Sequence, residues 1–208
     1  MPSEPLLPVR ADHDVPLCVP HLAGNEWDYV SSCLDTGWVS SAGEFVETFE
    51  AAIARRVGTD YAVATSSGTS ALHVALLVAG VQPGDEVVVS TLTFIAPANA
   101  IRYVGAHPVF VDAEPEFWQL DSERVRSFLE NDCRMVGGDL RNVHTGRRVR
   151  ALLPVHIVGH PADMDPLLDL AARQNPATRK AWQGGLIEEP APDTSAAPAQ
   201  PAAGAAKE

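Results

Sequence analysis

Residues 66–70 carry the chemistry that is easiest to recognise in this sequence. They read Ser-Ser-Gly-Thr-Ser and lie between an apolar run of β-type residues, 61–65, and a helical run. A strand, a turn of small residues and a helix N-terminus bring unpaired backbone N–H groups and the positive end of a helix dipole together, so this turn can bind a phosphate. Gly68 permits close approach of the backbone, and the hydroxyls beside it are further donors. The alternative is a helix cap that binds nothing.

Predicted strands and helices, which must position this turn, alternate along much of the chain. Apolar spacing, caps and turn residues predict helices over 22–36, 45–57, 69–79, 96–104, 122–131 and 164–173, and strands over 61–65, 86–90, 108–112 and 152–156. Repeated strand–helix units with short turns favour a parallel sheet covered by helices, a three-layer α/β/α fold. Ligands of such sheets bind beyond the carboxyl ends of the strands, where the phosphate turn is expected.

The composition indicates an acidic, largely globular protein. Its 208 residues have a formal net charge of −12, which disfavours nucleic acid or an anionic membrane as a partner. Basic residues cluster from Arg141 to Arg150, and so short a run is typical of a solvated loop. No apolar stretch reaches the length of a membrane span. Cys18, Cys33 and Cys133 are widely spaced and odd in number, which predicts reduced thiols in a cytoplasmic protein.

The chain divides into three parts by composition. Residues 1–14 are expected to form a flexible leader, and residues 15–174 contain all the predicted strands and helices. Residues 175–208 form a divergent tail, which is rich in Pro and Ala and is expected to be disordered from about residue 185. A segment of that composition buries too little apolar surface to offset the entropy lost on ordering.

Six motifs between residues 36 and 164 occur in the order found in one family. They are Thr-Gly-Trp-Val-Ser at 36–40, Ser-Gly-Thr-Ser-Ala-Leu at 67–72, Pro-Gly-Asp-Glu-Val at 83–87, Thr-Leu-Thr-Phe-Ile-Ala at 91–96, Pro-Val-Phe-Val-Asp at 108–112, and Pro-Val-His-Ile-Val-Gly-His-Pro-Ala-Asp-Met at 154–164. Each motif is weak evidence, but six in order are strong. Over about residues 15–173 the chain resembles the N-terminal part of the DegT/DnrJ/StrS sugar aminotransferases.

The resemblance implies a fold, a cofactor and partners. The fold would be the large domain of a fold-type I aminotransferase, here truncated, and the cofactor would be pyridoxal phosphate. Gly68, Thr69 and Ser70 would hold the phosphate, and Phe94 matches the aromatic residue that stacks on the pyridine ring. On spacing alone, Phe94 is equally compatible with a place in the core. The family transfers an amino group to keto sugar nucleotides, with glutamate as the expected donor, and its members are expected to be homodimers.

Three further residues have two readings each. His156 ends a predicted strand on the ligand side, so it could approach the cofactor or substrate, or it could bond a backbone carbonyl. His156 and His160 have the spacing of two metal ligands on a helix, but Gly159 and Pro161 make a helix implausible, so no metal site is predicted. Trp38 could line a sugar pocket or close the edge of the core.

The family also implies two groups that this sequence lacks in their expected place. They are an aspartate that pairs with the pyridine nitrogen and a lysine that forms a Schiff base. The sequence has lysine only at Lys180 and Lys207, both in the divergent tail, and Pro190 interrupts a faint likeness to the aspartate-bearing strand at residues 187–190. A frameshift, a gene fragment or a functional short form could give this pattern.

We therefore predict no catalytic residue in this chain, weak or absent cofactor binding, and no transaminase activity. Missing strands would expose a sheet edge and favour association or aggregation. The alternatives are a non-catalytic remnant or phosphate-ligand binding module and, more weakly, an unrelated α/β protein with a phosphate loop. The turn lacks the Gly-Lys-Ser/Thr ending of a nucleotide P-loop and the spaced glycines of a dinucleotide fold.

Overall fold

The computed structural model describes residues 19–174. The predicted leader, 1–14, and the predicted tail, 175–208, lie outside the described residues. The described chain forms two compact units that divide between Phe49 and Glu50. Within residues 19–174, no helix combines the length and the apolar character that crossing a membrane requires.

The first unit contains helix α1 (Glu26–Thr36) and the beginning of helix α2 (Glu44–Val57). The two helices meet through Tyr29 and Phe45, whose ring centroids are 5.0 Å apart. Helix α1 ends at Gly37, which has the left-handed conformation that glycine adopts without strain. Both predicted helices of this region are confirmed. Asn25 stands before the first of them, but its side chain makes no capping hydrogen bond.

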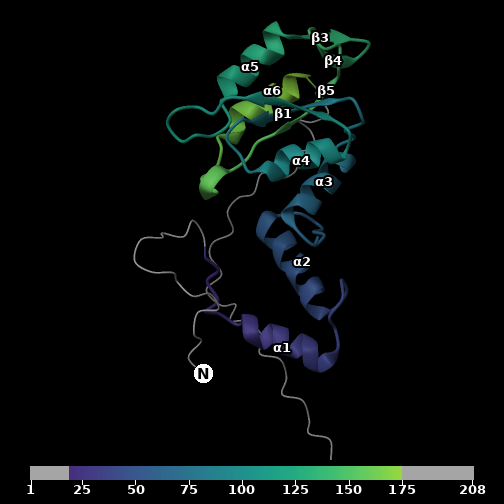
Figure 1. Ribbon diagram of the computed structural model, residues 1–208, viewed down its shortest axis with the longest axis vertical. Helices are drawn as coiled ribbons and strands as arrows, with labels where there is room; N and C mark the ends of the chain where they lie inside the picture. Colours follow the sequence, from purple (N-terminus) through teal and green to yellow (C-terminus); the bar gives the residue numbers. More distant parts are fainter. Residues whose placement is uncertain (1–18, 175–208) are drawn as a thin grey trace, which may run out of the picture. The chain divides into compact units, whose positions relative to one another are not determined.

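The second unit is built around a parallel sheet in the order β2-β1-β5. Figure 1 shows α5 above the labelled strands β1 and β5, and α4 and α3 below them. Strand β1 (Glu86–Ser90) is central and pairs with β2 (His107–Val111) on one side and with β5 (Val149–Leu153) on the other. The helices of the unit are α3 (Gly68–Val78), α4 (Ile95–Tyr103), α5 (Ser122–Asn131) and α6 (Met164–Gln174). A short 3-10 turn, Ile157–Gly159, follows β5.

Alternate residues of β1 enter two separate hydrophobic clusters. Val87 and Val89 pack with Leu76 of α3 and Ile101 of α4. Val88 points to the opposite face, where it packs with residues of α5 and α6. All five residues of β1 are buried, as expected for a strand covered on both faces. The predicted three-layer α/β/α arrangement with a parallel sheet is confirmed.

Two predicted strands differ from the structure. Residues 61–65 form no strand, and Tyr61 and Val63 are more than four-fifths exposed. A strand needs a neighbour to bond its backbone, whereas here the N–H of Ala64 donates to the Glu50 carboxylate over 2.7 Å. The strand predicted at 152–156 is β5, which begins three residues earlier than predicted. It ends at Leu153, because the chain then turns toward the 3-10 segment.

The sequence reasoning also missed a hairpin between α5 and β5. Strands β3 (Cys133–Val136) and β4 (Asp139–Asn142) pair antiparallel through Gly137 and Gly138, both of which have positive φ. Positive φ at both turn positions is the geometry of a tight hairpin turn. A Gly-Gly pair between two short runs was the available signal.

The predicted solvated loop between residues 141 and 150 is correct only in part. Residues 143–147 are exposed and lie between β4 and β5, but the two ends of the run belong to those strands. Several of its side chains also bond two carboxylates, Asp85 just before β1 and Glu86 at its start. Arg148 donates to both carboxylate oxygens of Asp85 over 2.9 and 2.6 Å. Asn142 and Thr145 donate to Glu86, which is 3% exposed. Burial opposes ionisation of Asp85, but the hydrogen bonds from Arg148 and from the Gln82 N–H keep its pKa below the ordinary value.

Helix α5 begins at a side-chain cap that can be tested. The Asp121 carboxylate accepts hydrogen bonds from the backbone N–H groups of Glu123 and Arg124 over 2.9 and 3.1 Å. We expect Asp121→Ala to lower the free energy of unfolding by about 1 kcal/mol, since two helix N–H groups lose their acceptor. Asp121→Asn keeps an acceptor and should cost less than half as much. Urea denaturation followed by circular dichroism measures both, and equal losses would contradict a capping role.

Candidate functional site

The N-terminus of α3 is organised by three serines. Ser67 is the N-cap residue, and its hydroxyl accepts a hydrogen bond from the backbone N–H of Ser70 over 3.2 Å. The Ser70 hydroxyl lies 3.1 Å from the Ser67 hydroxyl and 3.2 Å from that of Ser66. The predicted turn and helix start are therefore present, and the hydroxyls surround the first turn of the helix.

The backbone N–H groups of Gly68 and Thr69 are the free donors of this turn. Within residues 19–174 neither has a hydrogen-bond partner, whereas those of Ser70 and Ala71 bond back to Ser67. An added Cβ at Gly68 would meet no atom within 4 Å, so the approach to these donors is open. Two unpaired N–H groups on a helix N-terminus, with hydroxyls beside them, fit the phosphate group of a ligand.

Phe94 lies at the start of α4, in the N-cap position, where the chain leaves the carboxyl end of β1. Its side chain is 72% exposed, so the alternative of a core phenylalanine does not describe it. An exposed ring face at the end of a central strand is available to stack on a flat ligand. Helices α3 and α4, which carry the two parts of this candidate site at their N-terminal ends, pack against each other through Leu76 and Ile101.

Thr93, which directly precedes Phe94 in the chain, is a residue that the sequence reasoning did not single out. Its hydroxyl oxygen is buried and has no hydrogen-bond partner within the described part of the chain. A buried hydroxyl without a partner costs free energy, so its presence calls for an explanation such as a ligand. The sequence signal was its place between Leu92 and Phe94, within a motif already recognised.

The other candidate residues, His156, His160 and Trp38, each have their own local surroundings. The Nδ1 atom of His156 accepts from the backbone N–H of Ala162 over 2.9 Å, so the expected carbonyl partner is replaced by an amide. In the neutral ring the proton is then on Nε2. His160 stacks on Phe117, with ring centroids 4.8 Å apart. Trp38, in the first unit, is 61% exposed and therefore closes no core there.

In the loop after β2, the acidic residue Glu114 serves the structure of the loop itself. The Glu114 carboxylate accepts backbone N–H groups from Gln119, Phe117 and Glu116 at 2.7–3.1 Å. These bonds, that from Gln119 above all, hold the pKa of Glu114 below its ordinary value. Gln119 in turn accepts the N–H of Ile157, which ties this loop to the 3-10 turn. Glu114 is thus committed to the backbone.

The site as described supports binding and ring stacking but contains no amine nucleophile. Lysine occurs in this sequence only at positions 180 and 207, so residues 19–174 have none. The residues described therefore fit the phosphate and the flat ring of pyridoxal phosphate. The covalent attachment that the resemblance implies needs a residue outside them.

Comparison with known proteins gives the same family as the motifs. The DegT/DnrJ/EryC1/StrS aminotransferase family matches residues 20–176. GDP-perosamine synthase of Caulobacter vibrioides is 42% identical over 161 residues, which are 77% of this chain and 39% of that protein. The chain thus spans about two-fifths of the length of this relative.

Solved structures agree on the fold. DesV of S. venezuelae, in complex with a ketimine intermediate, matches with a TM-score of 0.57 and 37% identity over 71% of this chain and 36% of its own. NtdA of Bacillus subtilis, with its bound cofactor PMP, matches with a TM-score of 0.55 and 28% identity over 71% of this chain and 30% of its own. These neighbours have the fold-type I aminotransferase architecture, as the resemblance implied. On both the sequence motifs and the fold, the chain belongs to the DegT/DnrJ/EryC1/StrS aminotransferase family.

Proposed function

We propose that this chain holds the phosphate and the ring of pyridoxal phosphate in the manner of a sugar aminotransferase. The observation that carries the proposal is the pair of unpaired N–H groups at Gly68 and Thr69, on a helix start that is open to solvent. Ser70 adds a hydroxyl, and Phe94 presents an exposed ring for stacking. PMP, the cofactor bound to NtdA, is the amine form of the same compound.

The proposed reaction is transfer of an amino group to a keto sugar nucleotide, with glutamate as donor. Support comes from the relationship to GDP-perosamine synthase, whose name specifies an amino sugar on a nucleoside diphosphate. When bound, pyridoxal phosphate supplies an electron sink for proton transfers at carbon. The residues of this chain contribute position: the α3 N-terminus fixes the phosphate, and Phe94 restrains the ring.

A second function is favoured by the absence of lysine from residues 19–174. In that case the chain is a phosphate-ligand binding module without transaminase activity of its own. A positioned proton carrier contributes about 10²–10⁴-fold to a rate, so its loss alone would remove most turnover. We propose that this second description holds for the 208 residues taken by themselves, with weak cofactor binding.

Cofactor binding and turnover separate the two functions. We expect equilibrium dialysis of the purified chain to show weak, saturable binding of pyridoxal phosphate that inorganic phosphate displaces, without the visible absorption of a lysine-linked cofactor. With glutamate and a 4-keto-6-deoxy sugar nucleotide, we expect no aminated product. Turnover that requires added cofactor, is lost in Lys180→Ala and is retained in Lys207→Ala would establish the enzyme and identify its lysine. Absence of any phosphate-competed binding would overturn both functions.

A further inference from the structure

The segments that follow β2 and β5 meet at the carboxyl edge of the sheet. The three strands end almost level, because Val111 at the end of β2 pairs with Ser90 at the end of β1, and β5 ends one position earlier. Strand β1 lies between the other two and is followed by Phe94. Ligands of parallel sheets bind beyond this edge, so the two segments lie on the ligand side of the sheet.

Two contacts join these segments. The N–H of Ile157 donates to the side-chain oxygen of Gln119 over 3.3 Å, and the His160 ring stacks on the Phe117 ring with an angle of 12° between their planes. Gln119 is buried, and its side-chain nitrogen donates to the carbonyl of Phe117 over 3.1 Å. Together with the backbone bonds of Glu114, these contacts hold Phe117 in place although it is 52% exposed.

One residue in each segment has a backbone conformation that its side chain disfavours. Trp118 has a φ of 63° and Val158 a φ of 52°, and within residues 19–174 they are the only non-glycine residues with positive φ. Trp118 is 58% exposed and Val158 is 86% exposed, so burial of the side chains does not offset the strain. Strain of this kind persists where the surrounding structure enforces it, and it clusters at functional sites.

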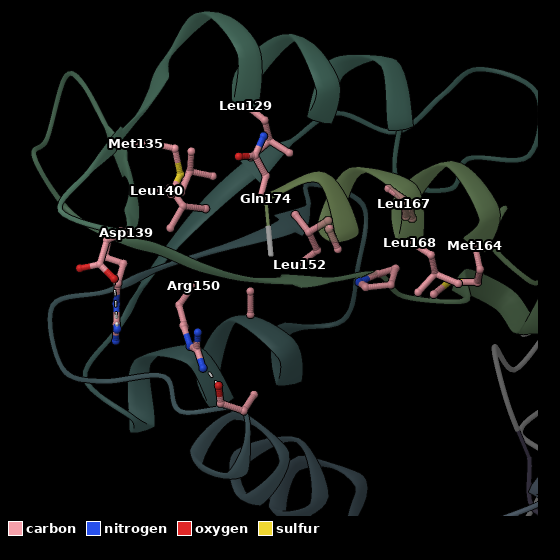
Figure 2. A pocket seen from close by; sticks show the side chains of 17 residues that line it. Leu129, Met135, Asp139, Leu140, Arg150, Leu152, Met164, Leu167, Leu168 and Gln174 are labelled. Atoms are coloured by element: carbon pink, nitrogen blue, oxygen red, sulfur yellow. Dashed lines mark hydrogen bonds and ion pairs between the residues drawn. The ribbon is translucent and has the colours of Figure 1, made fainter. Parts of the chain in front are cut away.

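The exposed rings lie outside the cavity beside β5. That cavity has a volume of about 820 Å³, and Figure 2 shows Leu129, Leu152 and Leu167 among its lining side chains. None of residues 91–121 or 155–163 lines it. Phe117 and Trp118 therefore present open surface at the carboxyl edge, which suits a flat group that stacks from one side.

We propose, building on the function proposed above, that Phe117 and Trp118 form a stacking platform for the base of the sugar nucleotide. Every nucleobase has a π-face that stacks on an exposed aromatic ring, and a purine offers the larger face. The base is also the uncharged part of a sugar nucleotide. Glu114 and Glu116 give this loop a negative charge, which disfavours the diphosphate beside it.

Saturation-transfer NMR with guanosine diphosphate on the full 208-residue chain tests the platform. Excess inorganic phosphate competes for the turn at Gly68, so that the base is the part observed. We expect saturable transfer from the protein to the guanine ring, and an affinity about tenfold lower in Phe117→Leu, which loses the aromatic face. Phe110→Leu is the matched control: Phe110 of β2 is also 52% exposed, and its loss should leave the affinity unchanged.

Trp118→Gly distinguishes a ligand contact from a structural role. Glycine adopts positive φ without strain, so the melting temperature should stay the same or rise, while the affinity for guanosine diphosphate falls about fivefold or more. Unchanged affinity in either Phe117→Leu or Trp118→Gly would overturn the proposal. So would displacement of the nucleotide by inorganic diphosphate, which would show that the phosphates and not the base are bound.

Dialysis with pyridoxal phosphate in parallel separates this proposal from the function on which it rests. Binding of pyridoxal phosphate without saturable binding of guanosine diphosphate would overturn the stacking platform alone. Binding of guanosine diphosphate that Phe117→Leu weakens, without binding of pyridoxal phosphate, would support the platform and contradict the proposed cofactor site.

Discussion

Asp85→Asn is expected to lower the free energy of unfolding by about 2–3 kcal/mol at pH 7. The substitution removes the anion that Arg148 meets with two hydrogen bonds, at a site where the two side chains are 8% and 25% exposed. Removing one partner of a largely buried pair leaves the other charge without compensation, and hydrogen bonds to charged groups contribute more than neutral ones. This pair also joins the start of β1 to the residue before β5, so its loss weakens the contact between two strands.

The same pair predicts how stability depends on pH. The folded pKa of Asp85 lies below the ordinary value of about 4, so its contribution is complete above that value and is lost as the pH falls through the folded pKa. We therefore expect the difference between the unaltered chain and Asp85→Asn to shrink between about pH 4 and the lowest accessible pH. Asp139→Asn is the control, because Asp139 is 37% exposed, 3.8 Å from Arg148 and 3.1 Å from the 40% exposed Arg141, and should cost less than about 0.5 kcal/mol. Urea titrations over this pH range measure both, and a constant difference would contradict the ion pair.

Gly68→Asp is expected to weaken the binding of pyridoxal phosphate by about 100-fold or more while leaving the fold intact. The new carboxylate would stand at the free N–H groups of α3, where the model of binding places the phosphate, and two anions would compete for one positive helix end. Stability should be unchanged or rise by about 0.3–1 kcal/mol, since an acidic residue in the first turn interacts favourably with the helix dipole. A loss of affinity for pyridoxal phosphate without a loss of stability would distinguish an anion-binding site from a turn with only a structural role.

Gly68→Ala is the matched variant for this experiment. An alanine Cβ would meet no atom within 4 Å, and the backbone of Gly68 does not have positive φ, so the substitution fits the fold. It adds no charge and should retain most of the binding. Equilibrium dialysis with pyridoxal phosphate, together with thermal unfolding of both variants, gives the two readouts. Equal affinities of the alanine and aspartate variants would show that the phosphate binds elsewhere.

Sequence patterns predicted best the elements whose ends carry their own signals. Strand β1 was predicted with its observed bounds because an apolar run follows a Pro-Gly-Asp turn, and α5 because Asp121 caps it. Residues 61–65 have the same apolar character as β1, yet they form no strand, since pairing depends on a neighbour that local sequence does not specify. The bonds that tie the run from Arg141 to Arg150 to β1 were missed for the same reason: Arg148 pairs with Asp85 and Asn142 with Glu86, which are far away in sequence.

In the candidate site, too, local features could be predicted from the sequence, and features that depend on packing could not. The turn at Gly68 could be predicted, because a helix N-terminus is a local feature and its free donors follow from helix geometry. The exposure of Phe94 could not, since spacing alone left a core position open. The motif at 91–96 includes Thr93, but the burial of its hydroxyl could not be predicted, because burial depends on how the chain after β1 packs against its surroundings.

The central place of β1 has a consequence for how the protein is made. The strand precedes its two neighbours in the sequence, and the buried members of the first hydrophobic cluster all lie between Leu76 and Ala106. That half of the core can therefore assemble on the ribosome about forty residues before β5 emerges, roughly 2–8 s at ordinary translation speeds. Among the strands of residues 19–174, this sheet grows outward from its middle as synthesis proceeds, and neither β2 nor β5 has to be inserted between two strands that are already paired.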